Sequence, residues 1–115
     1  MPLYLTESDV TALLNPGDAV ETVESCLRRM AEGEVQVAPR RRLRLPEGAL
    51  ADMAAADAGE GLAGAKLYAA TSQGATFVVC LFDSWTSELV GVIEADRLRC
   101  LRTGAASGVA SRLGL

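Results

Sequence analysis

The 115-residue chain is 50% hydrophobic and 23% charged, with a formal net charge of −4, which is typical of one globular domain. It contains no histidine, so catalytic pairs that need imidazole are excluded and the commonest metal ligand is missing. We therefore expect no metal site. We also expect no nucleic-acid partner, because the net charge is negative. We expect no membrane span or signal peptide, because no apolar run approaches the roughly 18 residues of a span.

Two helices are predicted at the N-terminal end. Residues 6–9 form a capping sequence, and apolar residues follow at helical spacing. The Asn-Pro-Gly sequence at residues 15–17 is expected to break this helix. A second helix is expected to begin with Asp18 as its cap and Glu21 as the capping partner, and to end near Gly33.

After residue 35 the apolar period changes from helical spacing to two, which predicts strands. In residues 40–45, alternation places the leucines on one face and Arg40, Arg42 and Arg44 on the other. Strands are expected over residues 40–45, 49–53, 62–69, 75–82 and 89–93. Asp96 is expected to cap a closing helix. The order predicts a single α+β domain over residues 1–115, with two N-terminal helices, a mostly antiparallel sheet of about five strands and a closing helix.

Three cysteines, Cys26, Cys80 and Cys100, are widely spaced and lie among apolar neighbours. An odd number of such residues favours buried free thiols over disulfides. Free thiols persist in reducing compartments, so we expect a cytoplasmic protein.

A formal GxGxxG sequence, the fingerprint of dinucleotide-binding domains, spans residues 59–64, and Asp83 lies at a distance that suits a ribose contact. The fingerprint requires a buried strand before it and a helix that opens within it. Here the preceding segment is small and polar, and the following segment resembles a short strand. We therefore interpret the motif as a loop.

Three groups of cations are candidates for binding a small anion. The arginine-rich residues 40–44 lie on a predicted strand, Lys66 lies inside an apolar strand, and Arg102 lies beside small residues on the last helix. Each has a structural alternative: a solvated strand face, a lysine whose ammonium reaches solvent, and a packed helix with a solvated arginine. The functional interpretation is that these side chains line a cleft and bind a carboxylate.

The ordered set of motifs resembles the ornithine cyclodeaminase/mu-crystallin family. The sequences that carry the resemblance are LTESDV at residues 5–10, PRRRL at 39–43, GLAGAK at 61–66, LFD at 81–83 and LRTGAAS at 101–107. The resemblance implies an N-terminal α+β domain that binds substrate and forms a homodimer, followed by a Rossmann domain that binds NAD(P). Family members act at the α-carbon of amino acids or imines.

The resemblance also implies roles for individual residues. Arg40, with Arg42 as the alternative register, Lys66 and Arg102 correspond to the substrate-binding cations, and Thr103 corresponds to a residue close to the cofactor. The family's catalytic aspartate belongs to the Rossmann domain, which these 115 residues lack, so we expect the chain to be a fragment or a truncated gene product. We therefore expect no turnover, and no NAD(P) binding, by these 115 residues alone.

One departure from the family pattern leaves two functions open. The family has a longer loop between the lysine and the next strand, which here is shortened to residues 69–75. The first hypothesis is the substrate-binding half of an NAD(P)-dependent enzyme. The second is a non-catalytic binding or dimerisation module of the same fold. An unpaired sheet edge and the small residues of the last helix would favour self-association in either case.

Overall fold

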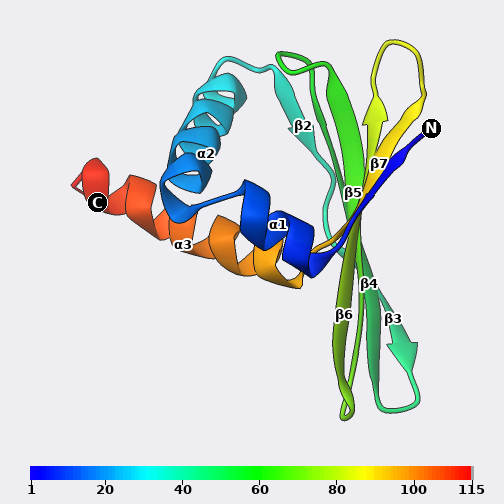
Figure 1. Ribbon diagram of the computed structural model, residues 1–115. Coiled ribbons are helices and arrows are strands. Elements are labelled where there is room, and N and C mark those ends of the chain that lie inside the picture. The colour runs from blue at the N-terminus through cyan, green and yellow to red at the C-terminus, as the bar shows by residue number, and fades with distance from the viewer. Residues whose placement is uncertain (115) are drawn as a thin grey trace.

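The computed structural model describes residues 1–114 and shows the predicted α+β class, with three helices on one side of a seven-stranded sheet (Figure 1). In chain order the elements are β1 (Leu3–Leu5), α1 (Glu7–Leu13), α2 (Pro16–Ala31), β2 (Val35–Val37), β3 (Arg41–Leu45), β4 (Gly48–Asp57), β5 (Leu62–Thr71), β6 (Gly74–Asp83), β7 (Leu89–Glu94) and α3 (Asp96–Arg112). The two additional strands are β1 and β2, which have three residues each.

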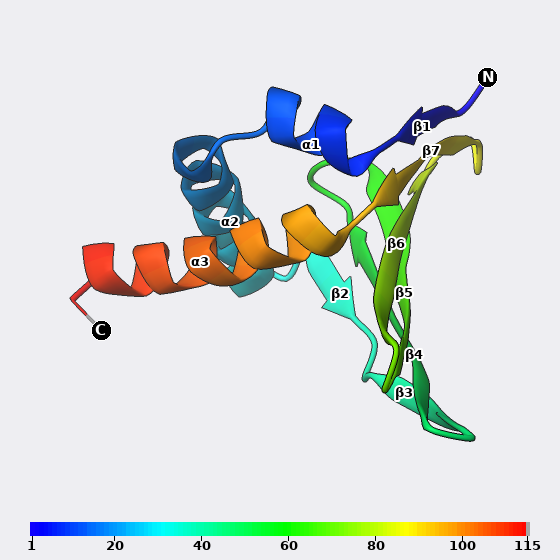
Figure 2. The same ribbon diagram turned by 60° about the horizontal axis from the view of Figure 1, so that its bottom comes forward.

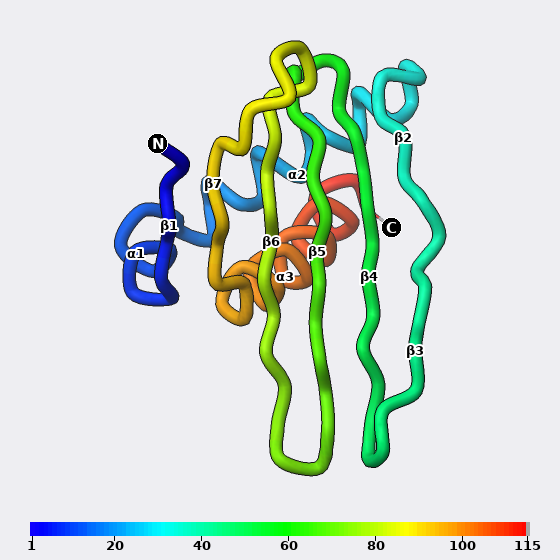
Figure 3. The backbone as a smooth tube through the Cα atoms, turned by 90° about the vertical axis from the view of Figure 1, so that its right-hand side faces the viewer, coloured from blue at the N-terminus to red at the C-terminus, as the bar shows by residue number. Residues whose placement is uncertain are grey.

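The sheet is built around β4, β5 and β6, which have ten residues each and pair as antiparallel neighbours. Its strand order is β1-β7-β6-β5-β4-β2, and β3 pairs with β4 beyond the end of β2 (Figure 3). Every pair is antiparallel except β1 with β7. The mostly antiparallel sheet predicted from the sequence is therefore confirmed.

The strand register decides which side chains face the helices. Lys66 pairs with Met53 on β4 and with Val79 on β6, so these three side chains share one face of the sheet. That face is turned towards the helices (Figure 2). The neighbouring Leu67 points to the opposite face, which no helix covers within residues 1–114 (Figure 3).

Helices α2 and α3 pack on each other through small side chains. The buried cluster consists of Ala19, Leu101 and Ala105. A Cβ atom built at Gly108 would lie 3.0 Å from Val20 Cγ2, so a larger residue there would press on α2. Ala105 and Gly108 of α3 are thus used inside the chain, whereas Gly104 of the same helix has open space around it.

The helix starts show which capping predictions hold. Thr6 and Asp9 form the predicted capping box of α1. The prediction for α2 was wrong: Asn15 is its N-cap, accepting a hydrogen bond from the backbone N–H of Asp18. Pro16 occupies the first turn, where its missing N–H costs nothing and its fixed φ suits the helix, so the Asn-Pro-Gly sequence starts α2 as well as ending α1.

The cap predicted for α3 was also wrong. Ala95 is the N-cap residue and provides no side-chain cap. The carboxylate of Glu7 instead accepts hydrogen bonds from the backbone N–H groups of Asp96 (2.9 Å) and Arg97 (3.0 Å). The start of α3 is therefore capped by the first turn of α1.

Two further features concern the described residues as a set. No helix in residues 1–114 is both long enough and apolar enough to cross a membrane. Cys26, Cys80 and Cys100 are free thiols, of which Cys26 and Cys80 are half-buried and Cys100 is exposed, so the predicted burial holds only in part.

Candidate functional site

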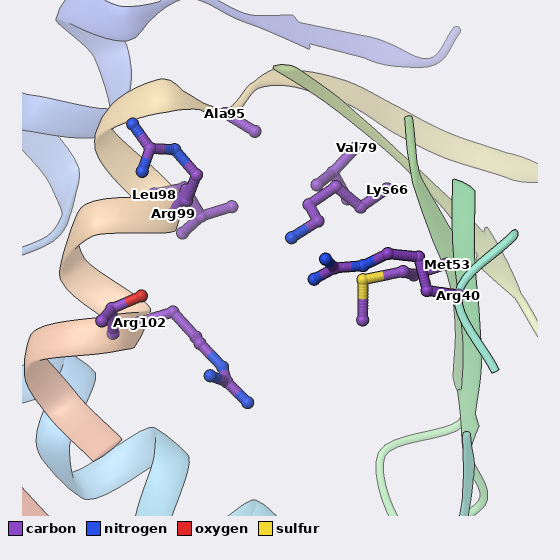
Figure 4. A pocket seen from close by; sticks show the side chains of 9 residues that line it. Arg40, Met53, Lys66, Val79, Ala95, Leu98, Arg99 and Arg102 are labelled. Carbon is purple, nitrogen blue, oxygen red and sulfur yellow. The ribbon is translucent and has the colours of Figure 1, made fainter. Parts of the chain in front are cut away.

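A pocket of about 440 Å³ lies between the helix-facing side of the sheet and the first turns of α3 (Figure 4). A volume of this size suits a small organic ligand. Its lining residues are Arg40, Met53, Lys66, Val79, Ala95, Leu98, Arg99, Arg102 and Thr103. The four candidate residues chosen from the sequence thus come from three separate segments of the chain and meet at one cavity.

Arg40 reaches the pocket from the segment immediately before β3. Figure 4 shows its guanidinium extending from the sheet towards α3, beside the ammonium of Lys66. Arg42, the alternative register, does not line the pocket: its Nη2 donates a hydrogen bond to the Tyr68 hydroxyl at 3.5 Å. The structure therefore places Arg40, rather than Arg42, at the pocket.

Lys66 stands in the middle of β5, between Met53 and Val79 on the neighbouring strands. Strand alternation directs its side chain to the helix-facing side, and the residue is half-buried. Met53 and Val79 flank its stem on the neighbouring strands, while the ammonium enters the pocket. An apolar strand can therefore contain this lysine, because the charged end of the side chain lies in the pocket and not among apolar groups.

Arg102 enters the pocket from α3, opposite the sheet (Figure 4). Thr103, the next residue of α3, also lines the pocket. Arg99 also lines the pocket, one helical turn before Arg102, and was missed in the sequence. Its Nη2 lies 2.7 Å from Asp96 Oδ1, and its guanidinium carbon lies 4.5 Å from the centre of the Phe77 ring. The three-residue spacing from Arg102 could have indicated a shared helix face.

The pocket is electrostatically one-sided. No carboxylate appears among its lining residues. The ion pairs found in the described part of the chain include Arg99, but not Arg40, Lys66 or Arg102. Three cations directed at one cavity without a carboxylate partner form a site complementary to an anion.

The GxGxxG sequence lies in the β4–β5 turn and continues into β5, and no helix follows it, so the loop prediction is confirmed. Gly61 has φ +68°, which the turn requires. Asp83 accepts hydrogen bonds from the backbone N–H groups of Trp85 (2.8 Å) and Thr86 (3.1 Å), which lower the pKa of its carboxyl. Asp83 is thus used within its own turn, and neither feature fits a dinucleotide site.

Metal chemistry has no candidate in this part of the molecule. Across residues 1–114, no group of three or more Cys, Asp or Glu side chains is placed to hold a metal ion.

The helix-backed, mostly antiparallel sheet thus directs three cations into one pocket, an arrangement complementary to a small anion. The model of the ornithine cyclodeaminase/mu-crystallin family matches residues 2–113, and the chain belongs to this family. A comparison with curated proteins found no match.

Solved structures with the same fold include three enzymes. An archaeal alanine dehydrogenase dimer with bound NAD is 29% identical, with a TM-score of 0.89 over 96% of this chain and 36% of that one. The iminosuccinate reductase of Paracoccus denitrificans in complex with NAD⁺ is 25% identical, with a TM-score of 0.85 over 95% and 37% of the two chains. A probable ornithine cyclodeaminase from Bordetella pertussis Tohama I, at 23% identity and a TM-score of 0.88 over 93% of this chain, shows the fold alone. The chain spans about a third of the length of these relatives (34% of the last).

Proposed function

We propose that this chain is the substrate-binding domain of an NAD(P)-dependent enzyme that acts at the α-carbon of an amino acid or imine. The observation that carries the proposal is the pocket at which Arg40, Lys66 and Arg102 meet without a carboxylate partner. A bound α-carboxylate would supply the missing negative charge. The arginines can offer paired N–H donors to its two oxygens, and Lys66 can add a third charge-assisted hydrogen bond.

This arrangement assigns a positioning task to the chain. A carboxylate held from the sheet by Arg40 and Lys66 and from α3 by Arg102 has little rotational freedom, so the attached α-carbon has a fixed direction. Thr103, beside Arg102, would lie on the side of the pocket nearest the cofactor. Met53, Val79 and Leu98 provide an apolar wall that limits water around the reacting carbon.

The cofactor itself requires residues beyond those described. Residues 1–114 contain no strand–glycine loop–helix unit that fits a dinucleotide. We assign NAD(P) binding and the catalytic aspartate to a Rossmann domain, in keeping with the length of the relatives and the NAD bound in two of them. NAD(P) would supply the hydride acceptor or donor. The 115-residue chain alone is expected to bind the carboxylate without turnover.

We further propose that the chain forms a homodimer through the uncovered face of the sheet. Leu43, Leu67 and Phe82 expose 67%, 44% and 41% of their surfaces there. Apolar surface of this kind marks an interface, and the similar alanine dehydrogenase is a dimer.

We also propose that the protein is located in the cytoplasm, because three free thiols suit a reducing compartment.

A non-catalytic binding or dimerisation module remains the second candidate function. The observation that favours it is the tight β5–β6 connection, in which only Ser72 and Gln73 separate two ten-residue strands. The family's longer loop at this position approaches the cofactor, and here that approach is shortened. In this alternative the chain keeps the family's fold and forms the dimer, but its pocket does not bind an amino-acid substrate.

Calorimetric titration of the 115-residue chain separates the two candidates. We expect L-alanine, L-proline or propionate to bind, and Lys66→Met or Arg102→Gln to weaken binding at least about tenfold, the cost of one charge-assisted hydrogen bond. Arg44→Gln is the matched control, because Arg44 lies on β3 outside the pocket lining. Failure of all three ligands to bind the wild-type chain would leave the module as the better description.

A further inference from the structure

An aromatic pair lies on the helix-facing side of the sheet, next to the pocket. Tyr68 on β5 and Phe77 on β6 are directly paired in the strand register. Their ring centroids are 5.1 Å apart and the rings are tilted by 31°. Tyr68 follows Lys66 by two residues, so both side chains leave the same face of β5. Tyr68 does not line the pocket itself.

Three of the four pocket cations lie over this pair. The guanidinium carbon of Arg40 is 5.9 Å from the centre of the Tyr68 ring, and Nζ of Lys66 is 5.7 Å from it. Arg99 covers Phe77 at 4.5 Å. All three distances are within the range in which a ring face attracts a cation.

The contacts with the Tyr68 ring offset the repulsion between the cations of the pocket. Arg40 and Lys66 carry like charges into one cavity whose lining residues include no carboxylate, and repulsion would drive such flexible side chains apart. A ring face that is electron-rich attracts both cations at once and restricts the directions in which they can turn. Packing against Phe77 in turn fixes the plane of the Tyr68 ring.

We propose that Tyr68 is a positioning residue of the anion site: its ring, held by Phe77, keeps the charged ends of Arg40 and Lys66 side by side so that both face one carboxylate. This inference rests on the proposed function, because it assumes that the pocket binds a carboxylate. The inference goes beyond the proposed function because it names what positions Arg40 and Lys66. That positioning is assigned to the face of the Tyr68 ring and not to a hydrogen bond from its hydroxyl.

The pKa of the Tyr68 hydroxyl reflects the cations around the ring. The hydrogen bond from Arg42 lowers the pKa of the phenol below its ordinary value, and the charges of Arg40, Arg42 and Lys66 lower it further against the effect of burial. The phenol therefore reports on the cations around it. The chain has only two tyrosines, so Tyr4→Phe leaves Tyr68 as the single phenol that titrates.

The first experiment is an ultraviolet titration of phenolate formation in the Tyr4→Phe chain. Tyr4 is 59% exposed, its hydroxyl donates a hydrogen bond to Glu94, and it is not among the residues that line the pocket. We expect the pKa of Tyr68 to rise when Arg40→Gln or Lys66→Met is added, because each removes a nearby positive charge. If the pKa of Tyr68 is unchanged in both variants, Arg40 and Lys66 do not lie against its ring, and the proposal fails whatever the ligand measurements show.

The second experiment measures propionate affinity in Tyr68 variants of the same chain. Tyr68→Leu removes the ring and is expected to weaken binding about five- to tenfold, the scale of cation–ring attraction at a partly exposed site. Tyr68→Phe keeps the ring and should stay within about twofold of the wild type. Circular dichroism before each titration verifies that the variants are folded.

The outcomes separate this proposal from the one on which it rests. Wild-type affinity in Tyr68→Leu, with binding still lost in Lys66→Met, overturns the role of the ring and leaves the carboxylate site standing. Equal losses in Tyr68→Phe and Tyr68→Leu overturn it too, because the hydroxyl would then be the active part. Absence of propionate, L-alanine and L-proline binding to the wild-type chain overturns the proposed function, and the positioning role with it.

Discussion

Arg29 and Asp57 form the most shielded ion pair in the described part of the chain. Arg29 Nε lies 3.0 and 2.9 Å from the two carboxylate oxygens, and Nη2 lies 2.8 Å from Oδ2. The two side chains are only 18% and 17% exposed. The pair joins the last turns of α2 to the end of β4, so it holds the helix against the sheet. Its hydrogen bonds lower the pKa of Asp57, against burial, which raises it.

This shift predicts a stability change in acid. Because the pKa of Asp57 is lower in the folded chain than in the unfolded chain, the pair stabilises the fold above the unfolded value of about 3.9, and the stabilisation is lost as pH falls through the folded value. We expect Asp57→Asn to lower the free energy of unfolding at pH 7 and to flatten its decline below about pH 4. Urea denaturation at a series of pH values measures both effects.

The control for this prediction is a second Arg–Asp pair, whose aspartate also lies on β4. Arg41 Nε lies 3.1 Å from Asp52 Oδ1, but the two side chains are 82% and 39% exposed. Exposed pairs contribute little, so Asp52→Asn should change the stability at pH 7 by less than about 0.5 kcal/mol. An equal loss in both variants would contradict the assignment of the acid sensitivity to the pair that is shielded.

At the scale of residues, the sequence indicated most of the pocket. Lys66 and Arg102 were found because a charge inside an apolar strand and an arginine among small residues both need an explanation, and the family motifs gave one. Alternation could not choose between Arg40 and Arg42, because residues two apart share a strand face. The choice depends on where β3 begins, at Arg41, which leaves Arg40 free to cross the pocket. Arg99 was missed because only the packed position of α3 shows which helix face meets the sheet.

The position of α3 depends on a side chain from the opposite end of the sequence. Glu7 accepts hydrogen bonds from the first two backbone N–H groups of α3 and donates its own N–H to Glu94 at 2.9 Å. Glu7→Gln should lower the free energy of unfolding by about 1 kcal/mol, since a neutral cap interacts less well with a helix N-terminus. Urea denaturation at neutral pH measures the difference.

A matched control is Glu21→Gln, because Glu21 is an exposed glutamate on α2. It should change the stability by less than about 0.5 kcal/mol. If Glu7→Gln were as stable as this control, the carboxylate would not be acting as the cap of α3.

At the scale of elements, long segments were predicted well and short ones poorly. The ten-residue strands contain apolar runs long enough to be found, although the predicted strand 49–53 covers only half of β4. Strands β1 and β2 have three residues each and form because neighbouring strands already present an edge. The start of α2 was placed three residues late because Asn15-Pro16-Gly17 contains both a breaker and a cap, and only the backbone shows which function prevails. Capping of α3 by Glu7 is a tertiary contact, which no local pattern contains.

The whole molecule has one covered and one uncovered face of the sheet. If the uncovered face is the dimer interface, Leu67→Asp should dissociate the dimer, because it would bury a charge without a partner at the interface. Sedimentation equilibrium of the two proteins measures the change. Leu13→Asp is the control, because Leu13 is 71% exposed but lies on α1, away from the sheet face. A monomeric wild type, or a dimer that survives Leu67→Asp, would contradict the interface.

The contacts of the N-terminal segment with β7 and α3 also determine the order in which parts of the chain can fold during synthesis. Strand β1 pairs only with β7, and Glu7 bonds to backbone groups 89 and 90 positions later. A ribosome that adds about 5–20 residues per second needs several seconds to supply those partners. The β4–β5 and β5–β6 hairpins can form during this interval, because their strands are adjacent in sequence. Residues 3–7 are therefore made before the segments that fix them, and α3 acquires its final orientation over the pocket only when Glu7 contacts its first turn.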